Sequence, residues 1–206
     1  MPRLRFDRVM VRCSAVLRGS RFALAPQDDG RASNHRTRDP TIALVVARAE
    51  NGAIGIGGDL PWRLSTDLKQ FRKITLGKPV LMGRRTFQSL PRVLDHRVNI
   101  VLSHEPGFVA PGAIVAGSLE EGLAHARRAA KEVGVDEIMV IGGDDVFRAV
   151  MPLAKRIYLT QVHASPDADT WFKDVNLEDW RELSRERHEP GPKDQYPFSF
   201  VVLERS

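Results

Sequence analysis

From Thr41 to the end of the chain, short apolar runs rich in β-branched residues alternate with stretches that repeat apolar residues at helical spacing. This alternation constrains the fold more than any other feature, because it is typical of α/β proteins with a largely parallel sheet. The expected strands cover 41–47, 78–82, 98–102, 114–115 and 137–141, and the expected helices cover 64–76, 84–90, 119–132 and 144–150.

The carboxyl-terminal part departs from this alternation. Three further apolar runs, at 156–162, 180–186 and 198–203, follow one another without a helical pattern between them. Since parallel pairing needs a crossover helix, we expect this end of the chain to pair antiparallel. No internal repeat or long linker interrupts residues 41–206, and 42% hydrophobic with 28% charged residues suits an ordinary globular protein. We therefore expect one domain.

The net charge of +5 comes from the amino-terminal part of the chain. Residues 1–40 hold nine Arg and four Asp, whereas the remainder holds 22 basic and 22 acidic residues. The charge therefore gives no reason to expect that the domain binds nucleic acid. Cys13 is the only cysteine, which excludes an intrachain disulfide and fits a reducing, cytoplasmic setting. No stretch reaches the roughly 18 apolar residues of a membrane-spanning helix.

Residues 1–40 are expected to form a poorly ordered, Arg-rich extension. Three explanations remain open: a targeting segment, a nucleic-acid-binding arm, or an upstream stretch included by a misplaced start. The last is favoured because Met10 is the only internal methionine ahead of the first expected strand, which begins near Thr41.

Asp67 lies in the first turn of the helix expected at 64–76, at the border of the apolar stripe that Leu64, Leu68 and Phe71 form. One interpretation is a solvated acid that the helix dipole favours. The other is a carboxylate recessed in a pocket, with a raised pKa and a nitrogen-rich ring to bind. Position alone favours the solvated acid.

A glycine-rich segment at 52–62, ending Leu60-Pro61-Trp62, joins the first strand to that helix. It is not a dinucleotide fingerprint, because a Rossmann motif requires the helix to follow the strand immediately. Two interpretations are open: a flexible lid closed by Leu60 and Trp62, or an ordinary surface loop with Trp62 packed inward.

Two strand-to-helix junctions have the composition of phosphate cradles. In the first, Gly83, Arg84, Arg85 and Thr86 open a helix directly after a buried strand, which favours an anion. In the second, Gly142-Gly143 lets backbone approach a ligand closely. Two such junctions in one sheet suggest a cofactor with separated phosphates.

The second junction has two other interpretations. It can be a tight turn with Asp144 as helix N-cap. The stretch 142–147 also looks like a loose version of the Gly-Gly-Asp-Glu-Phe turn of nucleotide cyclases, where acids bind metal. Against the latter, the residues that follow continue a helix rather than a second hairpin strand.

Taken in order, these segments resemble bacterial dihydrofolate reductases over essentially all of residues 41–206. The specificity lies in the ordered set, which is Val46-Ala47, Leu60-Pro61-Trp62, Asp67-Leu68-x-x-Phe71, Met82-Gly83-Arg84-Arg85-Thr86-Phe87, Arg97-x-Asn99-Ile100-Val101-Leu102-Ser103, Ile141-Gly142-Gly143, Tyr158-Leu159-Thr160 and Asp169-Thr170-x-Phe172.

The resemblance implies an eight-stranded, mostly parallel sheet with an antiparallel carboxyl-terminal hairpin and helices on both faces. It implies NADPH-dependent reduction of 7,8-dihydrofolate, in support of one-carbon metabolism, by a cytoplasmic monomer that binds neither nucleic acid nor membrane. Asp67 would hold the pteridine ring and promote its protonation, with Thr160, Leu60 and Trp62 completing the catalytic group. The substrate would contact Val46, Asp67, Leu68, Phe71, Leu90, Leu94, Arg97 and Ile141.

On the cofactor side, the adjacent cations Arg84 and Arg85, with Ser103 nearby, favour NADPH over NADH because a 2′-phosphate needs positive partners. The full set that the resemblance implies is Ala47, Ile54, Gly55, Gly83, Arg84, Arg85, Thr86, Leu102, Ser103, His104, Gly142, Gly143, Asp145, Val146 and Phe147. No metal is expected.

Three departures from the family pattern put parts of the site in doubt. A Pro-Leu-Pro-Gly-like turn is replaced by 93–96, so this loop is expected to be less rigid, and Asp95 to compete for Arg97, the partner of the substrate's α-carboxylate. Asp144 and Asp145 add negative charge beside the presumed pyrophosphate. Phe147 stands where a Tyr is common.

Two other functions stay open. A related reductase of the same fold, acting on a pyrimidine intermediate of riboflavin synthesis, would share the cofactor side but lack the spacing from Trp62 to Asp67 and the Arg97 site. A nucleic-acid-binding protein would use the Arg-rich leader on an idle body, and deleting residues 1–40 separates this case.

Overall fold

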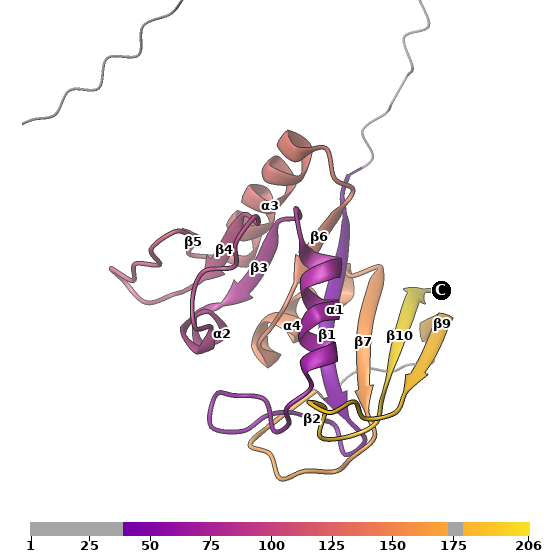
Figure 1. The fold of residues 1–206 in the computed structure, drawn as a ribbon. Coiled ribbons are helices and arrows are strands. Elements are labelled where there is room, and N and C mark those ends of the chain that lie inside the picture. Colours follow the sequence, from indigo (N-terminus) through magenta and orange to yellow (C-terminus); the bar gives the residue numbers. More distant parts are fainter. Residues whose placement is uncertain (1–38, 173–178) are drawn as a thin grey trace, which may run out of the picture. The chain divides into compact units, whose positions relative to one another are not determined.

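The apolar runs expected as strands form one sheet (Figure 1). The computed structural model describes residues 39–172 and 179–206, so the expectations for residues 1–38 lie outside the described residues. The sheet has the order β5-β4-β3-β6-β1-β7-β10-β9. Its strands are β1 (Thr41–Ala49), β3 (Val80–Gly83), β4 (Asn99–Leu102), β5 (Ile114–Ala116), β6 (Glu137–Val140), β7 (Arg156–Val162), β9 (Trp180–His188) and β10 (Phe198–Arg205).

The strand directions match the prediction. In the part of the sheet with the order β5-β4-β3-β6-β1-β7, each strand pairs in parallel with its neighbour. Only at the carboxyl end does the direction reverse, where β10 pairs antiparallel with β7 and β9 antiparallel with β10. The predicted mostly parallel sheet with an antiparallel carboxyl-terminal hairpin is therefore confirmed.

Helices cover both faces of the sheet because the central strands are apolar on both sides. On one face, α3 (Leu119–Val133) and α4 (Asp144–Val150) pack on the alternate strand residues that include Leu44 and Ile138. On the other face, α1 (Ser65–Thr75) and α2 (Arg84–Ser89) cover Ala43, Val80 and Met139. A 3-10 turn, η1 (Met151–Leu153), follows α4.

A second, two-stranded sheet was not expected. Strand β2 (Ala53–Gly55) pairs antiparallel with β8 (Thr170–Trp171) and fixes the base of the glycine-rich segment. The backbone N–H of Gly57 donates to Asp169 Oδ2 at 2.6 Å, which adds a side-chain contact to this pairing. Strands of two and three residues that include a glycine leave no periodic pattern to detect.

The amino ends of the strands are joined by an ion-pair network. Glu137, only 5% exposed, accepts from Lys78 Nζ at 2.7 Å and from Arg156 Nη1 at 2.9 Å. Tyr158 donates its hydroxyl to the same carboxylate at 2.9 Å. Burial opposes ionisation of Glu137, but these donors hold its pKa below the usual value. Arg156 continues the network to Glu204 on β10.

The carboxyl ends of the parallel strands lie at the opposite edge, together with the glycine-rich segment and the start of α1 (Figure 1). Ligands of open α/β sheets bind at this edge. Among the residues that the structure describes, no helix is both long and apolar enough to cross a membrane.

Candidate active site

Asp67 is a recessed carboxylate rather than a solvated acid. It lies in the first turn of α1 and is 8% exposed. Thr160, 7% exposed on β7, donates its hydroxyl to Asp67 Oδ1 at 2.7 Å. Burial raises the pKa of Asp67, the Thr160 hydrogen bond opposes this rise, and the charge of Asp194 adds to it. The acid is thus held ready to accept a proton or donor groups from a ligand.

The sheet register brings these two side chains together. Thr160 lies beside Ala47 in the parallel pairing of β7 with β1 and faces α1, whose first turn crosses these strands near their carboxyl ends. Because Thr160 is 93 residues from Asp67 in sequence, the contact depends on the completed fold.

Trp62 packs inward, at 4% exposure, against Leu64 and the carboxyl ends of β1 and β7. Its indole Nε1 is buried and has no hydrogen-bond partner among the described residues. A buried indole N–H usually finds a partner, so this donor suits a ligand or an ordered water at the pocket. Leu60, in contrast, is 40% exposed. The inward Trp62 agrees with the surface-loop interpretation, and the exposed Leu60 leaves the lid interpretation open.

The predicted apolar wall is only partly brought together. Leu90, Leu94 and Ile141 are partly buried on the sheet face that α1 and α2 cover, and Phe71 is partly buried on α1 itself. Leu68, next to Asp67, leaves 58% of its surface exposed, which suits a residue that borders a ligand site.

Val46 is the exception. Its side chain lies in the core of the opposite face, with residues of α3 and α4, so it can serve the pocket only through its backbone.

The two glycine junctions adjoin each other. The backbone N–H of Gly83, at the end of β3, donates to the carbonyl oxygen of Gly142 at 2.7 Å. Gly142 has φ +115°, and a Cβ there would lie 3.2 Å from the Phe147 ring. The Thr86 hydroxyl lies 3.4 Å from a Cβ placed on Gly143. Bare backbone and the Thr86 hydroxyl therefore lie close together where two strands end, an arrangement that suits a phosphate group.

The charged residues around these junctions are partly engaged with one another. Arg84 Nε lies 3.1 Å from Glu105 Oε2, and Glu105 donates its backbone N–H to Ser103 Oγ at 3.2 Å. Arg85 and His104 are exposed. Leu102 is partly buried at the end of β4. Arg84 and the Ser103 turn are thus linked through Glu105, and their contact with a 2′-phosphate stays a prediction.

Asp144 forms an ion pair with Arg148 along α4. The alternative interpretation that Asp144 caps the helix is wrong, because the N-cap is Gly143 and no side-chain cap is formed there. Asp145 is exposed. The cyclase-like interpretation is also wrong, since residues 144–150 form a helix in which Val146 and Phe147 are buried.

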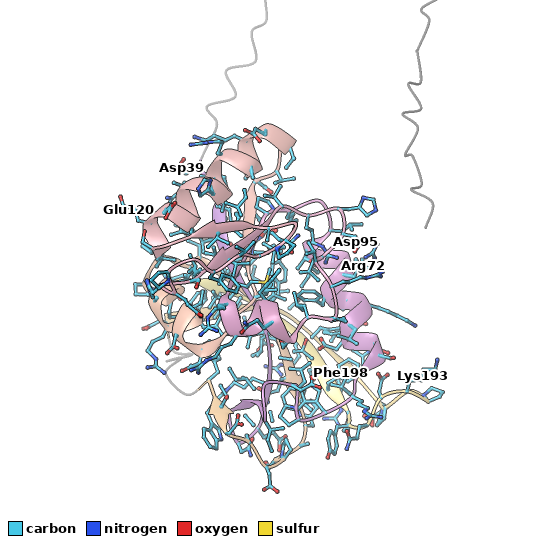
Figure 2. The ribbon with its side chains drawn as sticks, turned by 90° about the vertical axis from the view of Figure 1, so that its left-hand side faces the viewer. Asp39, Arg72, Asp95, Glu120, Lys193 and Phe198 are labelled. Carbon is cyan, nitrogen blue, oxygen red and sulfur yellow. The ribbon has the colours of Figure 1, made fainter. Side chains whose placement is uncertain are left out.

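Arg97 has a side chain only 3% exposed, and protein groups occupy its guanidinium. Its Nη2 donates to Asp95 Oδ1 at 2.9 Å, its Nε to the Asp95 carbonyl at 2.9 Å, and its Nη1 to Thr75 Oγ1 at 2.8 Å. Arg72, on α1, contacts the same carboxylate through both terminal nitrogens, at 2.6 and 2.9 Å. Figure 2 shows Arg72 and Asp95 side by side. The predicted contact of Asp95 with Arg97 is therefore confirmed.

The loop at 93–96 is also held by side chains. Asn99, 2% exposed, donates to the carbonyls of Leu94 and Arg97 at 2.8 and 3.0 Å. Hydrogen bonds to Arg72, and then to Arg97, hold the pKa of Asp95 well below its usual range. These contacts hold the loop where the family pattern has prolines, and the expected loss of rigidity stays a prediction.

Two residues were not recognised as part of the site. Asp169 contacts the glycine-rich segment, and Asp194, in the loop between β9 and β10, contacts the first turn of α1. Asp169 stands in one of the segments that carry the family resemblance, but no role was assigned to it, and Asp194 stands in none of them. An acid after Gly191-Pro192 indicates only a turn.

These features define a class: an α/β protein whose sheet edge holds a phosphate-bearing cofactor beside one buried acid. A model of the family described as dihydrofolate reductase matches residues 41–205. The chain belongs to the dihydrofolate reductase family.

Individual relatives agree. The chain is 42% identical over 164 residues to dihydrofolate reductase type 3 of Salmonella typhimurium, covering 80% of this chain and 98% of the relative. It is 39% identical over 165 residues to the Haemophilus influenzae dihydrofolate reductase, covering 80% and 99%. The solved Enterococcus faecalis enzyme, in complex with NADP(H), has a TM-score of 0.74 at 31% identity and covers 82% of this chain and 98% of its own.

Proposed function

We propose that this chain reduces 7,8-dihydrofolate to 5,6,7,8-tetrahydrofolate with NADPH. The observation that carries the proposal is the recessed Asp67, held by Thr160 at the same sheet edge as the two glycine junctions. The named relatives, and the neighbour solved with NADP(H), support the substrate and the cofactor.

Asp67 would accept hydrogen bonds from a ring nitrogen and the amino group of the pteridine, and its charge would favour a proton on the imine nitrogen. A protonated imine makes the adjacent carbon a better hydride acceptor, and general-acid assistance of this kind contributes about 100-fold or more. Water would deliver the proton, and Trp62 Nε1, a buried donor that no described residue engages, would orient it. Bound NADPH supplies the hydride.

The cofactor side rests on the junction geometry. Gly142 and Gly143 bring bare backbone next to the Thr86 hydroxyl, and Arg84 and Arg85 add charge. The remaining positions proposed from the family resemblance are Ala47, Ile54, Gly55, Leu102, Ser103, His104, Asp145, Val146 and Phe147. The preference for NADPH over NADH follows from the arginines, although Glu105 partly neutralises Arg84.

Arg97 is the proposed partner of the substrate's α-carboxylate. Because Asp95 already occupies Nη2 and Nε of Arg97, the incoming carboxylate has to exchange with an internal one. We expect tail binding to be weaker than an unoccupied arginine would give.

The test is the loss of reduced nicotinamide absorbance with dihydrofolate, using NADPH and NADH in parallel. Turnover with dihydrofolate and a strong preference for NADPH are expected. Asp67→Asn should slow hydride transfer strongly at neutral pH and less in acid, where part of the substrate is already protonated. An equal loss at every pH would remove the role given to Asp67. Turnover of a pyrimidine substrate in place of dihydrofolate would favour the related reductase.

We further propose that residues 41–206 are the whole catalytic domain, and that the enzyme is a cytoplasmic monomer without a nucleic-acid partner. The family match over 41–205 supports the domain limits. Charged side chains fill the exposed edge strand β9, which disfavours edge-to-edge pairing. A chain lacking residues 1–40 should keep its turnover and sediment as a monomer. Loss of salt-sensitive affinity for nucleic acid on this deletion would instead support the alternative.

A further inference from the structure

The helix that carries Asp67 has no cap of its own. The N-cap position of α1 is Leu64, whose side chain cannot accept a hydrogen bond, so no side-chain cap is formed there. The first backbone N–H groups of a helix otherwise lack partners. In this chain, the loop between β9 and β10 supplies the missing acceptors.

Asp194 makes the main contacts. Its Oδ1 accepts from the backbone N–H of Thr66 at 3.0 Å, and its Oδ2 accepts from the Thr66 hydroxyl at 2.7 Å. The neighbouring Lys193 carbonyl accepts from the Ser65 N–H at 3.4 Å, and Leu64 and Asp194 form a β-bridge. In Figure 2, Lys193 lies near one end of α1 while Arg72 marks the other. The contact spans 128 residues of sequence.

We propose that Asp194 is a positioning residue for Asp67, which holds the first turn of α1 so that the carboxylate stays at its depth beside Thr160. This inference rests on the proposed function. Thr66 directly precedes Asp67, so the first turn is held at two points: Asp194 binds Thr66, and Thr160 binds Asp67 itself. Without the contact between Asp194 and Thr66, the first turn of α1 can shift. The hydrogen bond from Thr160 then holds only the carboxylate of Asp67.

Charge gives a second route from Asp194 to Asp67. Burial opposes ionisation of Asp194, but hydrogen bonds from Thr66 and the backbone hold its pKa below the usual value. Asp194 therefore stays negative while Asp67 titrates, and this charge contributes to the raised pKa of Asp67. Among the neighbouring charged side chains, Arg63 before α1 and Lys193 on the loop are exposed to solvent.

The experiment separates the two contributions in the full chain. Asp194→Asn keeps an oxygen for the Thr66 N–H but removes the charge, whereas Asp194→Ala removes both acceptors. Lys193→Ala changes an exposed side chain of the same loop and leaves the Asp194 contacts in place, so it is the matched control. Single-turnover hydride transfer from NADPH to dihydrofolate is followed across pH, alongside the KM for each ligand.

Asp194→Ala should slow hydride transfer about five-fold at neutral pH, with the KM for NADPH unchanged. Five-fold in rate is the roughly 1 kcal/mol of a lost N-cap contact when it appears in the activation barrier. Asp194→Asn should stay within about two-fold of the parent rate, but its pH profile should move to lower pH because a charge near Asp67 is gone. The control should match the parent in both.

Three outcomes overturn the proposal. One is an unchanged rate and pH profile in both Asp194 variants. Another is a lower free energy of unfolding with no change in the rate or the pH profile, because Asp194 would then have a structural role only. The third concerns the case in which Asp194→Ala does not fold. Thr66→Val, which removes only the hydroxyl contact, and Asp194→Asn then test the proposal. Rates and pH profiles like those of the parent in both variants overturn it. An inactive parent enzyme would refute the proposed function instead, and the outcomes are therefore distinguishable.

Discussion

Thr160→Val removes one hydroxyl and keeps the shape of the side chain, so it isolates the hydrogen bond to Asp67. The bond is 2.7 Å long, and both partners are more than nine-tenths buried, at 7% and 8% exposure. A hydrogen bond to a charged group contributes about 1.5–3 kcal/mol. Since about 1.4 kcal/mol corresponds to one pKa unit, the pKa of Asp67 should rise by about 1–2 units in the variant.

The stability should change with pH in the same sense. Burial already raises the pKa of Asp67 in the folded state, so ionised Asp67 costs stability. This cost starts to shrink as pH falls below the raised folded pKa, and it is gone below the lower pKa of the unfolded chain. Thr160→Val enlarges the cost by about 1.5–3 kcal/mol where Asp67 is ionised, and by less where it is protonated.

Carboxyl carbon chemical shifts of Asp67 give its pKa, and urea unfolding at neutral and acidic pH gives the stability. Thr160→Ser keeps the hydroxyl and is the control. A pKa of Asp67 that stays the same or falls in Thr160→Val would refute the reasoning, because the hydroxyl would then not stabilise the charged form.

Three further predictions concern other parts of the molecule. Asp95→Asn should lower the KM for dihydrofolate about two- to five-fold, because it releases Arg97 and Arg72 from an ion pair. The KM for a dihydropterin without a glutamate tail should stay unchanged. Equal changes for both substrates would contradict this prediction. Gly122→Ala, on α3, should lower the free energy of unfolding, measured by urea denaturation, by about 1–3 kcal/mol, because the new Cβ would lie 2.6 Å from a methyl group of Leu102. A more stable variant would show instead that α3 can shift without cost. Gly142→Ala should raise the Kd for NADPH more than that for dihydrofolate in fluorescence titrations, since φ is +115° and the Phe147 ring is 3.2 Å from the added carbon; an unchanged Kd for NADPH would argue against the cradle.

The main sheet could be predicted because its strands are buried on both faces and its helices keep a regular apolar stripe. Helix α4 ends where the 144–150 pattern ends, and β7 coincides with 156–162. The small sheet of β2 and β8 could not be predicted, since strands this short depend on the partner segment more than on their own residues.

The site divides in the same way. The glycine junctions can be predicted from local sequence, because glycines directly after a buried strand are typical of a close approach of backbone to a ligand. The burial of Asp67 carries none, because β7 and the loop between β9 and β10 create it from distant parts of the chain. The contact of Asp95 with Arg97 was predicted, whereas the hydrogen bonds from Asn99 to this loop were not.

The ion-pair network at Glu137 ties together the starts of β3, β6 and β7, and reaches β10 through Arg156 and Glu204. Four strands are thereby cross-linked at the edge farthest from the ligands. We therefore expect local opening of the sheet to be unequal along its strands: amide hydrogens at the linked edge should exchange more slowly than those at the ligand-facing edge.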